Sequence, residues 1–525
     1  MPESRPLRDL LDRWSAEGLL AGPVLEAGSP DATPAADLVL EGIRDDSRAV
    51  EPNELFVAVR GLKVDGHDFV APAVARGAAA VAVERRIDGL AVPQVLVDRG
   101  AAALASAAAW WHGDPSRELL VVGITGTNGK TTTSFLARTV LEAGGLRTGL
   151  VGTIGIEIGG ELRPNTVPNT TPGALELQGL LREMVDAGMA AAVIETSSHG
   201  LAADRVASVD YDAGIFTNLS HEHLDFHGTF EAYRDAKLRL FTRLGARATG
   251  DRPGLAIVNV DDEHGPRFAD AARATGAGVL TYGTSDGADL RIKDVGADAS
   301  RTWFDLEVAG RPAIPVSVPI PGRYNAPNAA AALGLAIGWD LDVRAAAEAL
   351  ERFEGVPGRM ESVRRGQPFH VVIDFAHTPT SIDFVGRELA NLARPTGGSL
   401  ITVLGASGER DVAKRPLMGE AAAWHSRLVI VTEDDSRNED PRSIFEQVAA
   451  GAKHAGKRLG EDLLVIGDRR EAIAEAFRQA RPGDVVLLAG KGHETWNMGP
   501  DGPVPWSDRE TALELLDAAG DPLSR

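Results

Sequence analysis

Gly123-Ile124-Thr125-Gly126-Thr127-Asn128-Gly129-Lys130-Thr131-Thr132-Thr133 is the stretch that decides the central fold of this chain. Residues 119–122 before it are apolar, as in a strand, and residues 134–143 after it have a helical pattern. A glycine-rich turn between a strand and a helix aims backbone N–H groups and the positive end of the helix dipole at one point. The lysine adds a charge for a β- or γ-phosphate, and Thr131 adds a hydroxyl for Mg²⁺. The stretch therefore predicts a loop that binds a nucleoside triphosphate, in an ATP-using enzyme.

The glycine spacing separates this phosphate loop (residues 123–133) from the common one. Glycines stand at 123, 126 and 129, and Ile124 occupies the place where the common motif has its first glycine. The alternative is a glycine turn that precedes a lysine by chance. The strand and helix patterns on either side disfavour that alternative.

The composition limits the classes of protein to which the chain can belong. Its 525 residues are too many for one core and suit three or four domains. The net charge of −21, from 54 basic and 75 acidic residues, disfavours a nucleic-acid binder. Without cysteine, the chain can form no disulfide, thiolate zinc site or cysteine nucleophile. No apolar signal segment is visible and the alanine-rich run 101–111 is too short to span a bilayer, so we expect a cytoplasmic protein without membrane contact.

Strand-like and helical patterns alternate along the chain, which is typical of α/β domains with mostly parallel sheets. We predict three domains: a small N-terminal α/β domain that binds UDP (1–116), a central ATP-binding domain built on the phosphate loop (117–355), and a C-terminal Rossmann-like α/β domain that binds an amino acid (356–525). The strand candidates of the first two are 54–59, 79–83, 191–194, 213–216 and 255–258.

The third predicted domain has four strand candidates, at 371–373, 400–404, 428–431 and 485–488. A polar loop follows each of them. Ligands of open α/β sheets bind beyond the carboxyl ends of the strands. We therefore predict that these four loops contribute to one site.

The central domain carries candidate metal ligands. Glu195 ends an apolar run, where a carboxylate for Mg²⁺ would sit, and a glutamate that caps a helix is the alternative. Three histidines and two carboxylates lie within residues 221–227. Their spacing fits either a metal loop, zinc included, or a polar turn with solvated histidines. Lys237 lies on a predicted helix, where a lone lysine is usually a solvated surface charge.

Taken together, these motifs resemble the Mur ligases of peptidoglycan synthesis. The resemblance rests on the phosphate loop, on Glu-Thr-Ser-Ser-His-Gly-Leu at 195–201, on residues 217–220 and 223–225, and on Lys237. Residues 46–48, residues 169–172 and the loops of the third predicted domain look like those of the members that add the third residue of the peptide. The resemblance covers nearly the whole chain, in family order.

The resemblance implies a three-domain, ATP-dependent amide ligase. It would add a diamino acid to UDP-N-acetylmuramoyl-L-alanyl-D-glutamate through an acyl phosphate, with ATP and Mg²⁺ as cofactors. Lys130 would reduce the repulsion between carboxylate and triphosphate. Thr131 and Glu195 would hold one Mg²⁺. The second Mg²⁺ would be held by Glu195, His223 and a carbamylated Lys237, which displaces the zinc and surface-lysine interpretations because Mg²⁺ prefers oxygen ligands.

The resemblance also implies which residues contact the nucleotides and the muramoyl dipeptide. Adenine and ribose would contact Asn325, Arg359 and Asp374. The UDP end would contact Ser47, Arg48, Leu62, Lys63 and Val64. The dipeptide would contact Asn169, Thr170, Thr171, Ser197 and Arg205. The chain departs from the family at Ala203, where a glutamine is frequent, so one substrate contact is missing or replaced.

The diamino acid pocket, by the same resemblance, would be formed by Arg410, Asp434, Asp435, Ser436, Arg437, Gly490 and Glu494. Members that use meso-diaminopimelate typically have Asp-Asn-Pro-Arg where this chain has Asp-Asp-Ser-Arg at 434–437. Arg437 would pair with a distal carboxylate, whereas Asp435 favours a bare distal ammonium unless it pairs with Arg437. Ser436 in place of proline loosens the loop. On the charge of Asp435 we predict L-lysine or L-ornithine ahead of meso-diaminopimelate.

Two alternative functions share some of these motifs. Folylpolyglutamate synthase belongs to the same superfamily, but its phosphate loop lies close to its N-terminus, unlike the loop at 123–133 here. A non-catalytic nucleotide-binding protein would not need a second metal site. We also expect a monomer.

Overall fold

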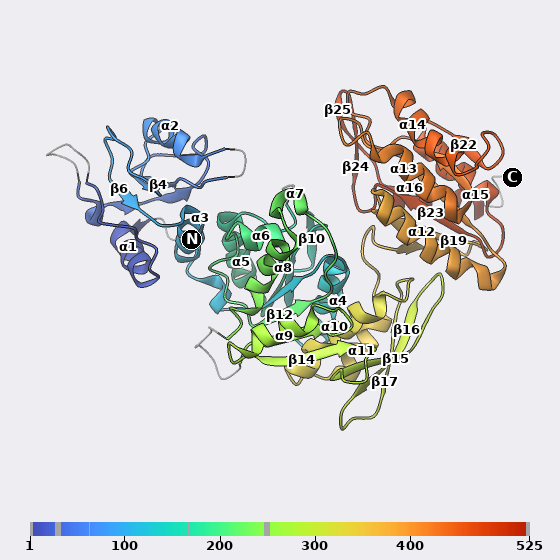
Figure 1. Ribbon diagram of the computed structural model, residues 1–525, viewed down its shortest axis with the longest axis horizontal. Coiled ribbons are helices and arrows are strands. Elements are labelled where there is room, and N and C mark those ends of the chain that lie inside the picture. Colours follow the sequence, from blue (N-terminus) through green and yellow to red (C-terminus); the bar gives the residue numbers. More distant parts are fainter. Residues whose placement is uncertain (1–3, 27–32, 62–63, 166–168, 246–252, 521–525) are drawn as a thin grey trace. The chain divides into compact units, whose positions relative to one another are not determined.

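The computed structural model describes residues 4–26, 33–61, 64–165, 169–245 and 253–520 (Figure 1). The chain forms two compact units: Met1–Asp289 with Ala331–Val343, and Leu290–Ala330 with Arg344–Arg525. Of the residues predicted to contact the UDP end, Leu62 and Lys63 lie outside the described part. The domain boundaries near 116 and 355 stay predictions.

The N-terminal part of the first unit is a small parallel sheet covered by helices. Its strands run in the order β3 (Gly42–Arg44), β4 (Glu54–Val57), β5 (Ala80–Val83), β6 (Gln94–Leu96). The helices are α1 (Leu7–Ala16), α2 (Val70–Ala75) and α3 (Gly100–Trp111), and β1 (Arg5–Pro6) pairs with β2 (Val39–Leu40). The many alanines of α3 favour a helix, because alanine is the best helix former. Almost every residue of α3 is buried, so this helix belongs to the core.

The central sheet carries the phosphate loop. Its strands in this unit run in the order β10 (Glu161–Pro164), β9 (Gly155–Ile158), β8 (Thr148–Val151), β11 (Ala191–Glu195), β7 (Leu120–Thr125), β12 (Ala213–Phe216), β13 (Leu255–Asn259), β14 (Gly278–Gly283). From β8 to β14 the strands are parallel. The carboxyl ends of β11, β7 and β12 therefore lie side by side at one edge, which brings residues distant in the sequence to the same place.

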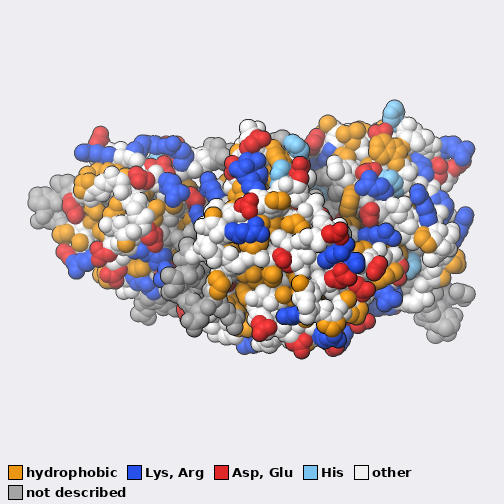
Figure 2. All heavy atoms as spheres, turned by 60° about the horizontal axis from the view of Figure 1, so that its bottom comes forward, with side chains coloured by type: hydrophobic (Ala, Val, Ile, Leu, Met, Phe, Trp, Pro, Cys, Tyr) orange, Lys and Arg blue, Asp and Glu red, His pale blue; other side chains and the backbone are white. Residues whose placement is uncertain are grey.

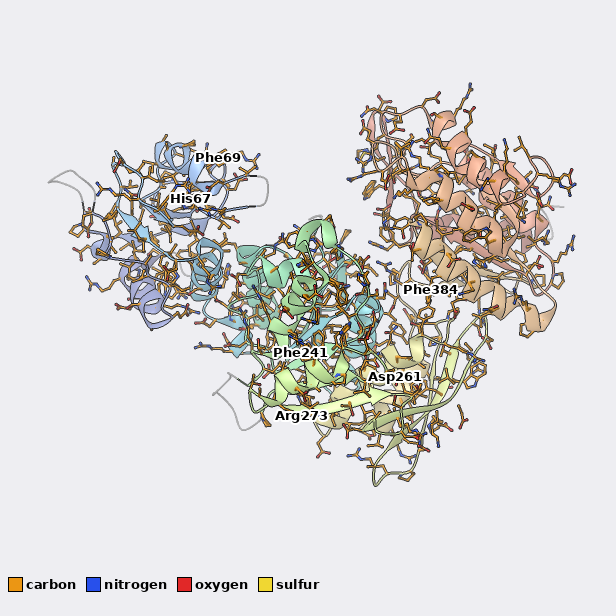
Figure 3. All side chains as sticks on the ribbon, viewed as in Figure 1. His67, Phe69, Phe241, Asp261, Arg273 and Phe384 are labelled. Atoms are coloured by element: carbon orange, nitrogen blue, oxygen red, sulfur yellow. The ribbon has the colours of Figure 1, made fainter. Side chains whose placement is uncertain are left out.

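Helices pack against this sheet and complete its core. They are α4 (Lys130–Ala143), α5 (Ala174–Asp186), α6 (Ser198–Ala202), α7 (Leu224–His227), α8 (Phe230–Phe241) and α9 (Gly265–Arg273). Phe241, labelled in Figure 3, ends α8 and meets Phe268 of α9 with ring centroids 5.2 Å apart. Phe268 stacks in turn on Phe216 of β12 at 3.9 Å. These aromatic contacts fix α8, the helix that carries Lys237, against the sheet.

The second unit begins with the antiparallel strands β15 (Leu290–Ala297), β16 (Thr302–Val308) and β17 (Ile314–Val318). The chain passes between the units just before β15, and again within the helices α10 (Asn325–Gly338) and α11 (Val343–Glu351). A further sheet follows, in the order β18 (Glu361–Val363), β19 (His370–Asp374), β23 (Val485–Ala489), β20 (Leu400–Leu404), β21 (Ser426–Val431), β22 (Leu463–Val465). Only its β18–β19 pairing, among the described strands, is antiparallel.

Five helices and a hairpin surround that sheet: α12 (Pro379–Ala393), α13 (Lys414–His425), α14 (Pro441–His454), α15 (Arg469–Gln479), α16 (Asp508–Gly520), and β24 (Trp496–Gly499) with β25 (Gly502–Pro505). Within the described residues, no helix has the length and apolarity needed to cross a membrane. Basic and acidic side chains are interspersed on the face drawn in Figure 2.

The α/β class predicted from the sequence is confirmed. Each strand candidate coincides with or overlaps a strand, and 213–216 and 400–404 match β12 and β20 to the residue. Buried parallel strands consist of continuous apolar runs, which is why they stand out in the sequence.

Candidate functional site

The phosphate loop joins β7 to α4 in the way predicted, and β12 holds it in place. Gly126 has a φ of +151°, and a Cβ there would lie 1.9 Å from Thr217 Oγ1. The Asn128 carbonyl accepts hydrogen bonds from Thr217 Oγ1 at 2.7 Å and from Asn218 Nδ2 at 3.0 Å, and the Asn128 N–H donates to Asn218 Oδ1. Gly129, at a φ of +86°, precedes the first turn of α4. The loop thus has a defined shape that requires glycine at 126.

Two lysines meet at one carbonyl of this loop. Lys130 Nζ donates to the Gly126 and Thr127 carbonyls at 3.0 and 2.9 Å, and Lys237 Nζ, from α8, donates to the Gly126 carbonyl at 2.7 Å. Lys237 is 1% exposed, and its Nζ lies 4.6 Å from the centre of the Tyr233 ring. Burial and the charge of Lys130 lower the pKa of Lys237 well below its usual range. The surface-lysine interpretation of Lys237 is therefore wrong, because residue spacing on α8 does not reveal the loop that covers it.

Glu195 is fully buried at the end of β11 and faces the first turn of α4. Its Oε2 accepts from Thr131 Oγ1 and from Thr153 Oγ1, both at 3.0 Å, and its Oε1 accepts from the Thr153 N–H at 3.0 Å. The cap of α6 is Ser197, whose Oγ accepts from the Gly200 N–H, so the helix-cap interpretation of Glu195 is wrong. A carboxylate beside two hydroxyls is a donor set that suits Mg²⁺.

The histidine-rich loop lies next to these groups. His223 adopts a left-handed φ of +56°, and its ring lies 4.7 Å from that of His199. His199 also contacts Phe226 and His227, and burial together with these two neighbouring histidines lowers its pKa to about 4. His221 and His223 are exposed. Among the described residues, no three histidine or carboxylate groups of this loop converge as metal ligands, so the geometry does not support a zinc site.

The residues predicted to contact the dipeptide gather around Glu195. Thr171 Oγ1 donates to the Glu195 carbonyl at 2.7 Å, and it lies 3.0 Å from Ser197 Oγ. Arg205 Nη1 donates to the Thr171 carbonyl at 2.9 Å. Thr170 Oγ1 lies 3.2 Å from Thr153 Oγ1, and the Asn169 carbonyl accepts from Asn165 Nδ2 at 3.1 Å. The segment 169–171 therefore lies beside the phosphate loop and the carboxylate of Glu195.

Two residues that matter to this geometry were absent from the sequence prediction. Thr153 holds Glu195, and Tyr233 OH lies 2.9 Å from Thr127 Oγ1. Thr153 follows β8, the parallel neighbour of β11. The signal in the sequence that could have indicated its role is a polar residue just beyond a strand end. Tyr233 lies one helical turn before Lys237 and therefore on the same face of α8.

The residues predicted to bind UDP and adenosine belong to other parts of the chain than the phosphate loop. Ser47 is buried in the N-terminal part, and the exposed Arg48 pairs with Asp46 at 2.8 Å. Asn325, Arg359 and Asp374 belong to the second unit, so a shared site with the phosphate loop stays a prediction.

The three residues of the second unit have distinct surroundings. Asn325 is buried and its Nδ2 donates to the Pro321 carbonyl at 2.8 Å. Asp374 accepts backbone N–H groups of Met360 and Ala376, and burial raises its pKa. The guanidinium carbon of Arg359 lies 5.1 Å from the centre of the Phe375 ring, and no described residue forms a hydrogen bond with its buried Nε.

The loops of the C-terminal sheet bring three carboxylates onto one buried lysine. Lys491 Nζ lies 2.8 Å from Asp435 Oδ1, 2.8 Å from Glu494 Oε2 and 3.8 Å from Asp434 Oδ1. Burial raises the pKa of Asp434 to about 6. Gly490, at a φ of +110°, leaves room for Asp434, because a Cβ there would lie 2.4 Å from Asp434 Oδ2. Lys491 was also absent from the sequence prediction, although it adjoins Gly490.

The remaining residues of the predicted amino-acid pocket differ in exposure and in hydrogen bonding. Arg410 is exposed on the loop after β20. Ser436 is buried, and Gly408 packs against its carbonyl. Arg437 donates its backbone N–H to the Met498 carbonyl, and its buried Nε has no hydrogen-bond partner in the part of the chain that the structure describes. No ion pair joins Arg437 to Asp435, both of which are described, so the predicted blocking of Arg437 is not observed.

Three known domain families match segments of this chain. "Mur ligase family, catalytic domain" matches residues 39–111, "Mur ligase middle domain" matches residues 124–336, and "Mur ligase, glutamate ligase domain" matches residues 358–492. The three matches follow one another in the order of the three predicted domains.

Individual relatives match nearly the whole chain. A UDP-N-acetylmuramyl-tripeptide synthetase from Roseiflexus sp. (strain RS-1) is 45% identical over 500 residues, which are 94% of this chain and 97% of that protein. A UDP-N-acetylmuramoyl-L-alanyl-D-glutamate–2,6-diaminopimelate ligase from Bacillus velezensis is 39% identical over 497 residues, 94% and 96% of the two chains. A solved structure of a ligase with that same name is 32% identical, covers 94% of this chain and 98% of its own, and has a TM-score of 0.68.

Proposed function

Because this chain belongs to the Mur ligase family and is an ATP-dependent ligase of peptidoglycan precursor synthesis, we propose that it adds a diamino acid to UDP-N-acetylmuramoyl-L-alanyl-D-glutamate. The observation that carries this proposal is the convergence at Glu195. The phosphate-loop hydroxyl of Thr131 and the segment 169–171 both bond to this one residue. A γ-phosphate on the loop and a substrate carboxylate at 169–171 would therefore be held next to each other.

The chemistry proceeds in two steps. A carboxylate oxygen of the D-glutamate residue attacks the γ-phosphorus, the bond to the β-phosphate oxygen breaks, and ADP leaves with an acyl phosphate formed. The neutral amine of the incoming amino acid then attacks the acyl carbon, inorganic phosphate leaves, and the amine loses a proton as the amide forms. Lys130 reduces the repulsion between the two anions of the first step, and backbone N–H groups of the loop contact the phosphates.

Thr131, Thr153 and Glu195 fit Mg²⁺, because all three side chains present oxygen. Thr131 and Glu195 would hold one ion, and Glu195, His223 and Lys237 would hold a second. Bound there, the ions would supply positive charge that neutralises the phosphoryl group. Lys237 contributes in this scheme as a carbamate formed with CO₂. Its Nζ is buried against the Gly126 carbonyl, where a bare ammonium would repel both Lys130 and a metal ion.

The loops of the C-terminal sheet are proposed to bind the diamino acid. Asp434 and Glu494 are carboxylates suited to an ammonium group. Arg437 offers a guanidinium whose Nε has no hydrogen-bond partner among the described residues. The charge argument for L-lysine or L-ornithine loses its basis, because Asp435 already bonds to Lys491. The proposal is therefore a diamino acid, with meso-diaminopimelate, L-lysine and L-ornithine as its candidates.

Phosphate release that depends on the amino acid tests this proposal. The protein is supplied with ATP, Mg²⁺ and UDP-N-acetylmuramoyl-L-alanyl-D-glutamate, and the three diamino acids are compared side by side. Turnover with one of them supports the proposal and identifies the amino acid. Turnover only with a folate or another acyl substrate would retain the family and overturn the proposed substrate.

A further inference from the structure

Asp435 is bonded to the rest of its loop rather than turned towards open space. Its Oδ1 accepts from Lys491 Nζ at 2.8 Å and from the Met498 N–H at 2.7 Å. Its own N–H donates to Asn497 Oδ1 at 2.7 Å. Asp435 is 5% exposed and Lys491 is fully buried, with its Nζ 5.0 Å from the centre of the Trp496 ring. The hydrogen bonds of Asp435 to Asn497 and Met498 therefore anchor the β24–β25 hairpin to the loop 434–437.

The charges around Lys491 do not cancel. Asp434, Asp435 and Glu494 supply three carboxylates to one ammonium. These three carboxylates are also the group, among the described residues, whose oxygens could hold a metal ion. Lys491 Nζ already contacts these carboxylates and leaves their negative charge in excess. The group can therefore attract a further cation of ammonium size more readily than a divalent ion with its own ligand shell.

We infer that Asp435 acts on amino-acid binding through Lys491. Because the charge of Asp435 attracts Lys491, the lysine is shared between Asp435 and Glu494. Glu494 and Asp434 therefore remain able to bind the ammonium of the incoming amino acid. This inference rests on the proposed function. Without the charge at 435, Lys491 and the substrate ammonium compete for the same two carboxylates. Asp435 is then a positioning residue that does not touch the substrate.

Asp435→Asn is the change that isolates this effect. Residue 435 has a left-handed φ of +53°, a conformation that asparagine tolerates as well as aspartate. An asparagine Oδ1 still accepts from Lys491 and from the Met498 N–H, so shape and hydrogen bonding persist while one negative charge is lost. Asp501→Asn is the matched control, because Asp501 is exposed at the turn of the same hairpin.

The inference predicts a change in KM for the amino acid at saturating ATP and UDP-muramoyl dipeptide. Asp435→Asn should raise that KM roughly tenfold, with kcat within about twofold, since one charge-assisted contact is weakened. The rise should be parallel for every diamino acid that the wild-type protein uses, and Asp501→Asn should leave KM unchanged. An unchanged KM would overturn the inference. A changed preference between L-lysine and meso-diaminopimelate would also overturn it, because it would mean that Asp435 contacts the distal group of the amino acid directly.

A second variant and a crystal structure complete the test. Adding Lys491→Gln to Asp435→Asn removes the competing ammonium and should return KM towards the wild-type value. A crystal structure of Asp435→Asn should show Lys491 Nζ displaced from residue 435 towards Glu494 and Asp434, and an unmoved Nζ contradicts the inference. The structure decides this even if the wild-type protein turns over none of the three amino acids, an outcome that would instead refute the proposed function.

Discussion

Lys130 and Lys237 donate hydrogen bonds to the same carbonyl oxygen, that of Gly126, at 3.0 and 2.7 Å. Two ammonium groups so close to each other repel, and the buried one is the less able to keep its proton. Lys237 is the buried member, which accounts for the lowering of its pKa. Burial thus makes Lys237 lose its proton more readily than an exposed lysine would.

Replacing Lys237 with alanine is predicted to abolish phosphate release. If the lysine serves as a carbamate, a short carboxylic acid added to the variant should restore part of the activity, because it supplies an oxygen ligand to the vacated space. Phosphate release is measured with and without the added acid. Lys453→Ala, at an exposed position of α14, is the control and should keep full activity. Full activity of unrescued Lys237→Ala would remove Lys237 from the site.

Lys130→Ala is predicted to abolish ATP turnover while the fold survives. The lysine bonds to carbonyls of its own loop at 126 and 127, so its loss should leave the strand and helix intact. It would remove the charge that we propose for binding the phosphates. Phosphate release and circular dichroism are measured on the same preparation. A folded variant with near-normal phosphate release would refute the role given to the phosphate loop.

The sequence predicted the parts of the site that depend on local patterns. The loop 123–133 follows β7 and opens α4 as its glycines and flanking runs indicated, and β12 matches its predicted span. The contacts that were missed join strands and loops distant in the chain. Thr153 reaches Glu195 between neighbouring strands, and Lys491 reaches Asp435 from another loop. Periodicity reports which face of an element is apolar, but not which polar residue another element brings to it.

Thr153→Val is predicted to weaken the response to Mg²⁺. The substitution keeps the shape and the backbone bond to Glu195 Oε1 but removes the hydroxyl bond to Oε2. A hydrogen bond to a charged group contributes about 1.5–3 kcal/mol, so the Mg²⁺ concentration for half-maximal activity should rise roughly ten- to hundredfold. Thr139→Val on α4, where the hydroxyl bonds to the Phe135 carbonyl of the same helix, is the control. An equal response of both variants to Mg²⁺ would show that Thr153 does not position Glu195.

Gly126→Ala is predicted to damage both stability and ATP use. A Cβ at 126 would lie 1.9 Å from Thr217 Oγ1 and 3.0 Å from the Asn218 carbonyl oxygen, so β12 and the loop must separate. Overpacking of this kind costs about 1–3 kcal/mol, and it shifts the carbonyl that both lysines share. Thermal unfolding and the KM for ATP are measured beside Gly287→Ala, a position where a Cβ meets nothing within 4 Å. A variant at 126 that behaves like the one at 287 would show that the loop can move away from β12 without loss.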